Sequence, residues 1–146
     1  MYAEAHPLAL NLDIDRIRDM LGQWRSNTHS AGLLARAITL AAARAHLLSG
    51  HDVVIPQFLG RLTFIEQAEG LARDTETSFH EIVLLDSKEN SLRRYADRGI
   101  HDASPAELAE MYDRLLAVVA ARPGAKLVST RQNEIDQAYR DFFAAL

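Results

Sequence analysis

Four short apolar segments, separated by long helical stretches, are the feature that most limits the folds open to this chain. The runs DVVI and IVLL have the composition of buried strands, and Pro56 closes the first of them. The connections are much longer than a hairpin needs, which favours parallel pairing. The pattern predicts an α/β fold, a three-layer parallel sheet with helices on both faces. The four predicted strands are residues 8–12 (LALNL), 52–55 (DVVI), 79–85 (FHEIVLL) and 126–130 (KLVST).

Helical periodicity fills the segments between these strands. Apolar residues recur at three- and four-residue spacing over 28–49, with Thr28 or Ser30 expected as the N-cap and Gly50 as the C-cap. The segment SPAE at residues 104–107 places proline at the first helical position and has the spacing of a capping box. Further helices are expected over about 15–21, 60–73, 88–98 and 134–146.

Composition excludes several classes of function. The 146 residues include no cysteine, so disulfides, thiolate metal sites and a cysteine nucleophile are absent, and the six histidines lack any metal-binding spacing. No apolar run approaches the roughly 18 residues that cross a bilayer, and the first ten residues do not resemble a secretory signal. A net charge of -4 argues against broad electrostatic binding of nucleic acid. We expect a cytoplasmic protein with no metal site and no membrane partner.

Polar residues gather where the predicted strands end. In a parallel α/β sheet, ligands bind just beyond the carboxyl ends of the strands. A ligand site is therefore expected along that edge of the sheet. The polar residues at these positions are Asp13, Asp15, Gln57, Arg61, Asp86, Ser87, Thr130 and Arg131.

Three segments of the chain resemble a known family in their order and spacing. They are LNLDIDRIR at residues 10–18, VVIPQFLGR at 53–61 and HEIVLLDSKENSLRRYADRG at 80–99. They are similar to bacterial P-loop kinases of the AAA-family ATPase group, which includes the polynucleotide 5'-kinase domain and chloramphenicol phosphotransferase. The resemblance covers residues 2–116. It implies transfer of the γ-phosphoryl group of ATP, with Mg²⁺, to a hydroxyl of a small molecule or of a nucleic-acid end.

The resemblance assigns the acceptor side of the reaction to four residues. Asp15 is the expected general base toward the substrate hydroxyl, and Arg18, three residues later, is expected to hold a substrate phosphate or polar group. Gln57 and Arg61 are expected to make further substrate contacts. The alternative is structural, with Asp15 capping a helix and Arg18 exposed to solvent.

The resemblance also assigns the ATP side of the reaction. It makes residues 88–104 a lid-like segment in which Arg94 and Arg98, four residues apart, reach the ATP phosphates, with Arg93 as a substitute. Arg131, after the last strand, is a further expected ATP contact. The alternative is an exposed basic helix face whose arginines pair with nearby acids.

One essential part of such a kinase is missing from the chain. A phosphate-binding loop has the form G-x-x-x-x-G-K-[ST], but neither lysine, Lys88 or Lys126, lies in that context. The resemblance therefore describes residues 1–146 as a single kinase-like domain that lacks its first βα unit. We expect little or no kinase activity from this polypeptide alone. The alternative function is a non-catalytic module that forms homo-oligomers through an exposed sheet edge.

Overall fold

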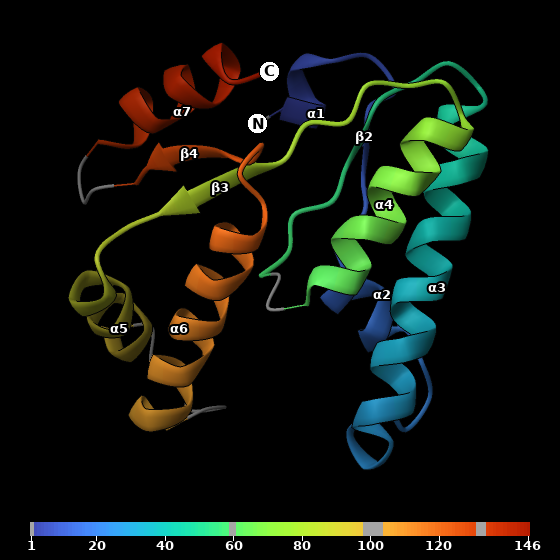
Figure 1. Ribbon diagram of the computed structural model, residues 1–146. Coiled ribbons are helices and arrows are strands. Elements are labelled where there is room, and N and C mark those ends of the chain that lie inside the picture. The colour runs from blue at the N-terminus through green and yellow to red at the C-terminus, as the bar shows by residue number, and fades with distance from the viewer. Residues whose placement is uncertain (1, 59–60, 98–103, 131–133) are drawn as a thin grey trace. The chain divides into compact units, whose positions relative to one another are not determined.

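The computed structural model describes residues 2–58, 61–97, 104–130 and 134–146. The chain forms two compact units, Met1–Phe79 and His80–Leu146 (Figure 1). Within the described residues, none of the helices is long and apolar enough to cross a membrane.

The first unit contains one pair of strands, together with the long helix α3 and several shorter helices. Strands β1 and β2 are parallel, with Leu10 opposite Val53 and Asn11 opposite Val54. The ladder continues at its end through the backbone hydrogen bond from Leu12 N to Val54 O at 2.8 Å. The elements are α1 (Tyr2–Ala5), β1 (Leu10–Asn11), α2 (Ile14–Asp19), the 3-10 helix η1 (Trp24–Ser26), α3 (Thr28–Leu47), β2 (Val53–Val54) and α4 (Leu62–Asp74).

The core of the first unit forms around helix α3, which contacts both α2 and α4 (Figure 1). Its buried face carries small residues at four-residue spacing, which allows a close approach of the neighbouring helices. Thr39 is fully buried, and its Oγ1 donates a hydrogen bond of 2.8 Å to the carbonyl oxygen of Ala35. The cluster at the centre consists of Ile14, Ala35 and Phe64, with Ile17, Leu40 and Ile55 packed against it.

The second unit has a longer pair of parallel strands. Strand β3 pairs with β4 from Ile82 opposite Lys126 to Leu85 opposite Ser129. Lys126 Nζ also donates a 2.6 Å hydrogen bond to the carbonyl oxygen of Ala145, which links the end of α7 to β4. The elements are β3 (Ile82–Leu85), α5 (Lys88–Asp97), α6 (Pro105–Ala121), β4 (Lys126–Ser129) and α7 (Ile135–Ala144).

Most local predictions are confirmed at the level of single elements. Each predicted strand contains an observed, shorter strand, and the pairing is parallel. The capping box is present, with the Ser104 hydroxyl accepting from Glu107 N and the Glu107 carboxylate accepting from Ser104 N. The N-cap prediction for the long helix is wrong, because Asn27 occupies that position. The C-cap prediction is also wrong, because Leu48 is the C-cap and Gly50, with its left-handed φ of 84°, lies two residues beyond it.

The predicted three-layer parallel sheet with helices on both faces, of the P-loop type, is wrong. Among the described residues, β1 pairs only with β2 and β3 only with β4, in two separate two-stranded sheets. The alternation of strands and helices correctly predicts that the two strands of one β-helix-β unit pair in parallel. It does not determine whether two such units are joined by hydrogen bonds into a single sheet. Leu84 and Leu127, on β3 and β4, are each 55% exposed, which a sheet covered on both faces would not allow.

Candidate functional site

Helix α2 begins directly after β1, and Asp13 is its N-cap. Asp13 Oδ1 accepts hydrogen bonds from the backbone nitrogens of Asp15 at 2.9 Å and Arg16 at 3.4 Å. Asp13 thereby satisfies the first donors of the helix. The alternative in which Asp15 caps the helix is therefore excluded, and the Asp15 carboxylate is not used for capping.

Asp15 and Arg18 lie next to each other on α2, one turn apart. Arg18 Nη1 is 3.1 Å from Asp15 Oδ1, and Arg18 Nη2 is 3.9 Å from Asp19 Oδ1. The side chain of Arg18 is 31% exposed and that of Asp15 is 57% exposed. Arg18 is thus held by contacts rather than freely solvated, whereas Asp15 remains open to solvent and to a ligand.

Trp24 is a residue of this site that the sequence analysis did not identify. The Cζ atom of Arg18 lies 4.3 Å from the centroid of the Trp24 ring, and the Cζ atom of Arg25 lies 4.5 Å from it. Both are cation–π distances. The adjacent Trp24 and Arg25, soon after an arginine-bearing helix, are the sequence signal that could have indicated the contact.

Gln57 and Arg61 follow β2 but do not join this group. No hydrogen bond or ion pair between described residues links Gln57 or Arg61 to Asp15 or Arg18. Arg61, exposed at the start of α4, instead lies near Arg36 of α3. Burial, followed by the positive charge of Arg61, lowers the pKa of the Arg36 guanidinium from its ordinary value.

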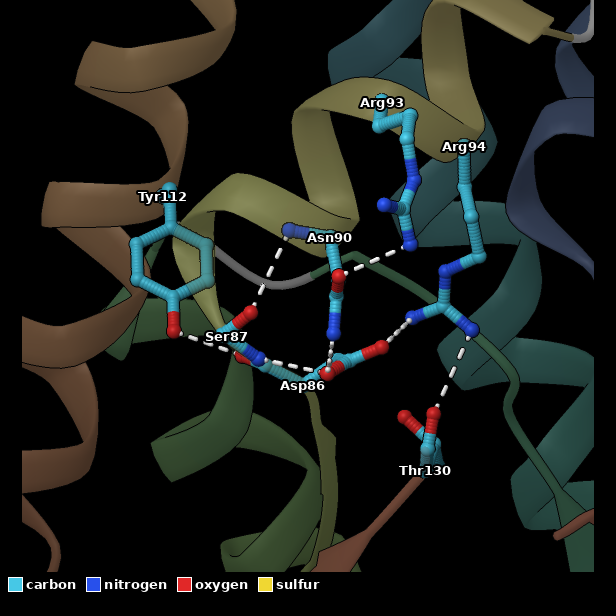
Figure 2. Close-up of polar contacts among 7 residues, drawn as sticks. All are labelled: Asp86, Ser87, Asn90, Arg93, Arg94, Tyr112 and Thr130. Atoms are coloured by element: carbon cyan, nitrogen blue, oxygen red, sulfur yellow. Dashed lines mark hydrogen bonds and ion pairs between the residues drawn. The ribbon is translucent and has the colours of Figure 1, made fainter. Parts of the chain in front are cut away.

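Asp86 is the centre of a second polar cluster, at the carboxyl end of β3 (Figure 2). Its Oδ1 accepts hydrogen bonds from Ser87 N at 2.7 Å and from Asn90 Nδ2 at 3.0 Å. Its Oδ2 lies 2.8 Å from Arg94 Nη2, and its side chain is only 4% exposed. The hydroxyl of Tyr112 on α6 donates a 2.7 Å hydrogen bond to the backbone carbonyl oxygen of Asp86.

These contacts keep Asp86 ionised. The hydrogen bond from Asn90 is the largest cause that lowers the pKa of the Asp86 carboxyl, and the Ser87 backbone nitrogen, Arg94 and Arg93 add to it. Together they outweigh burial, which raises the pKa. A carboxylate with a lowered pKa that is paired with an arginine is a poor proton acceptor at neutral pH, so Asp86 anchors its neighbours rather than acting as a base.

Of Arg94, Arg98 and Arg131, which are predicted to contact ATP, Arg94 lies within the described residues. Besides its contact with Asp86, Arg94 Nη1 donates a 3.3 Å hydrogen bond to the carbonyl oxygen of Thr130, so it joins the ends of β3 and β4 (Figure 2). Arg93 Nη2 donates to Asn90 Oδ1 at 2.9 Å. Beside Arg94 lies an open hollow of about 370 Å³, lined by Leu84, Ser91, Arg94, Tyr95 and Thr130.

Some of the residues predicted from the sequence to contact ATP lie outside the part of the chain that the structure describes. Arg98 and Arg131 lie outside the described residues, as does the part of the lid-like segment over 98–103. Within the described residues, no three His, Asp or Glu side chains are grouped to hold a metal ion. The buried Asp86 carboxylate is already occupied by Asn90, Ser87 and Arg94, so it does not fit a Mg²⁺ ligand.

Comparison of the chain with protein-family models, with curated proteins and with solved structures finds no match. The functional assignment therefore depends on the chemistry of the residues themselves.

Proposed function

We propose that the chain provides the acceptor side of an ATP-dependent phosphotransferase. In this proposal Asp15 accepts the proton of a substrate hydroxyl, and Arg18 binds a polar or anionic group of the same substrate. The substrate is a small molecule or a nucleic-acid end. The observation that supports this best is the 3.1 Å contact between Asp15 and Arg18, beyond the carboxyl end of β1, with helix capping left to Asp13.

The proposed chemistry needs a carboxylate within hydrogen-bond reach of the attacking oxygen and a cation that fixes the acceptor. Asp15 Oδ1 contacts Arg18, while the half-exposed carboxylate keeps its other oxygen available to a hydroxyl. Arg18 is oriented by contacts on two sides, Asp15 and Trp24. Less of the binding energy is then lost in ordering the arginine when the acceptor binds.

The ATP side of the proposal assigns the nucleotide phosphates to Arg94, Arg98 and Arg131. Its support is the fixed position of Arg94 between Asp86 and Thr130, beside the open hollow. Bound ATP with Mg²⁺ would supply the transferred phosphoryl group. The 146 residues contain no phosphate-binding loop, so this part of the reaction requires groups that the chain does not hold.

The absence of cysteine supports a cytoplasmic setting for the protein.

A second candidate is a non-catalytic module that forms homo-oligomers through an exposed sheet edge. Among the described residues β3 and β4 each have one edge without a strand partner, and the exposed Leu84 and Leu127 add apolar surface on the same sheet, which together favour this candidate. Light scattering after size exclusion separates the two: a stable oligomer that Leu84→Lys and Leu127→Lys each convert to monomer supports the module.

Transfer of radiolabelled phosphate from ATP tests the main proposal. The 146-residue chain alone is expected to transfer little or none to nucleosides, sugars or 5'-hydroxyl oligonucleotides. If the in-frame codons before Met1 encode a phosphate-binding loop, the longer polypeptide is expected to transfer the label, and Asp15→Asn to abolish transfer while ATP binding persists. Asp13→Asn is the matched control, because asparagine caps a helix as well as aspartate. Equal transfer by wild type and Asp15→Asn would contradict the proposal.

A further inference from the structure

Two guanidinium groups from different elements share the single indole of the chain. Trp24 is the only tryptophan among the 146 residues. The Cζ atoms of Arg18 on α2 and of Arg25 on η1 lie 4.3 and 4.5 Å from its ring centroid. A cation over an indole face gains an electrostatic attraction that increases as the contact loses water. The indole is thus placed to hold both cations.

A strained turn brings Trp24 to this position. Gln23, the residue before it, has a left-handed φ of 54°, which is costly for a residue with a Cβ atom. Its carbonyl oxygen accepts hydrogen bonds from Ser26 N and Asn27 Nδ2, both at 3.1 Å, which fix the turn. Strain that the surrounding contacts maintain is frequent at binding sites, where it holds a group in place before the ligand arrives.

Arg18 and Arg25 differ in how their charges are matched. Arg18 has Asp15 at 3.1 Å and Asp19 at 3.9 Å, and its Nε is shielded from solvent without a hydrogen-bond partner among the described residues. Arg25 has no ion pair with any carboxylate in the described part of the chain, and its guanidinium lies over the indole. The site therefore holds one matched cation and one unmatched cation beside an exposed carboxylate.

We propose that Trp24 is a positioning residue for Arg18, and that Arg25 supplies a second cation that makes the acceptor site select a doubly charged oxyanion. The acceptor would then be a hydroxyl compound that also carries a phosphate monoester. This inference rests on the proposed phosphotransferase, in which Asp15 takes the hydroxyl proton. Arg18 and Arg25 bind the phosphate oxygens, for which the forked guanidinium geometry is well suited.

Trp24 fluorescence reports directly on the site, because no other tryptophan contributes to the signal. The 146-residue chain is titrated at constant ionic strength and at a pH of about 8, where a phosphate monoester is doubly charged. The probes are glycerol 3-phosphate, glycerol, methyl phosphate and the singly charged dimethyl phosphate. A saturable change with glycerol 3-phosphate and methyl phosphate, but not with glycerol or dimethyl phosphate, is expected. No change with any probe, or an equal change with dimethyl phosphate, would overturn the inference.

An Arg25 variant, compared with an Arg16 variant as control, tests the assignment of Arg25 as the second cation. Arg25→Gln is expected to weaken binding of methyl phosphate about tenfold or more, the size typical of one lost charge-assisted contact. Arg16→Gln is the matched control, because Arg16 lies on α2 with Arg18, is 86% exposed and contacts Asp13 rather than the indole. It is expected to bind as wild type does. Equal affinities of Arg25→Gln and wild type would overturn the role of Arg25.

Calorimetric titration of Trp24→Phe and Trp24→Leu tests positioning apart from packing, with folding checked by circular dichroism. Phenylalanine keeps an aromatic face and should retain most of the affinity for methyl phosphate, whereas leucine should lose about tenfold. Equal losses in both variants would overturn positioning by the aromatic face.

The inference and the proposed function can fail separately. Dianion binding that depends on Trp24 and Arg25, without transfer that depends on Asp15, would refute only the phosphotransferase. Transfer that depends on Asp15, with dianion binding indifferent to Trp24, would refute only this inference.

Discussion

Arg94 Nη2 lies 2.8 Å from Oδ2 of Asp86, a carboxylate that is almost fully buried at the end of β3. The same arginine reaches Thr130 at the end of β4, so one side chain links both strand ends. The Asp86–Arg94 pair therefore sets the position of the cation beside the open hollow of the second unit.

Removal of the Asp86 carboxylate should destabilise the second unit. Asp86→Ala leaves the partly buried Arg94 without its ion pair and leaves the donors of Ser87 and Asn90 unmatched. We expect a loss of about 2 kcal/mol in the free energy of unfolding. Urea denaturation measures it. Asp113→Ala, which removes the exposed partner of Lys88, is the control and should cost less than about 1 kcal/mol. Equal losses in the two variants would contradict the structural importance of Asp86.

The lowered pKa of Asp86 also predicts how stability depends on pH. Because the folded carboxyl has a pKa below its unfolded value of about 3.9, its contribution is complete above that pH and is lost as the pH falls through the folded pKa. Thermal unfolding from pH 7 down to about pH 2 should show a wild-type advantage over Asp86→Asn that narrows below about pH 4. A constant difference between the two midpoints across that range would contradict this.

Local rules predicted single elements well because the relevant contacts are close in sequence. The spacing of apolar residues in 28–49 is sufficient to indicate a helix, and Ser104 lies only three residues from Glu107 in its capping box. The continuity of a sheet depends on backbone hydrogen bonds between distant strands, about which the composition of one strand says little. The four strand segments therefore predicted parallel pairs, but not that the pairs would remain separate.

The candidate site shows the same limit at the level of side chains. Two aspartates near the start of α2 can each cap it, and only the backbone geometry selects Asp13 and leaves Asp15 exposed. The contact of Arg18 with Trp24 depends on a left-handed residue, Gln23, that no propensity rule requires. Sequence spacing could thus propose the Asp15–Arg18 pair, but not the indole that holds it.

The capping box at the start of α6 should make a measurable contribution to stability. The Ser104 hydroxyl accepts a hydrogen bond from the backbone nitrogen of Glu107 at 3.3 Å. Ser104→Ala removes this acceptor and is expected to cost about 1 kcal/mol of unfolding free energy in urea denaturation. Ser104→Thr retains a hydroxyl and should stay close to wild type. A threonine variant as unstable as the alanine variant would indicate that the side-chain cap is not the cause.

The small face of α3 should tolerate no enlargement. Ala35 is fully buried in the cluster with Ile14 and Phe64, where α2 and α4 approach the helix. Three added carbon atoms in Ala35→Leu have no space there, so neighbouring side chains must shift, at a cost of about 1–3 kcal/mol. Ala37→Leu makes the same change on the exposed face of the helix and should stay within about 0.5 kcal/mol of wild type. Thermal and urea unfolding measure both, and equal stability of the two variants would contradict the close packing of α3 at Ala35.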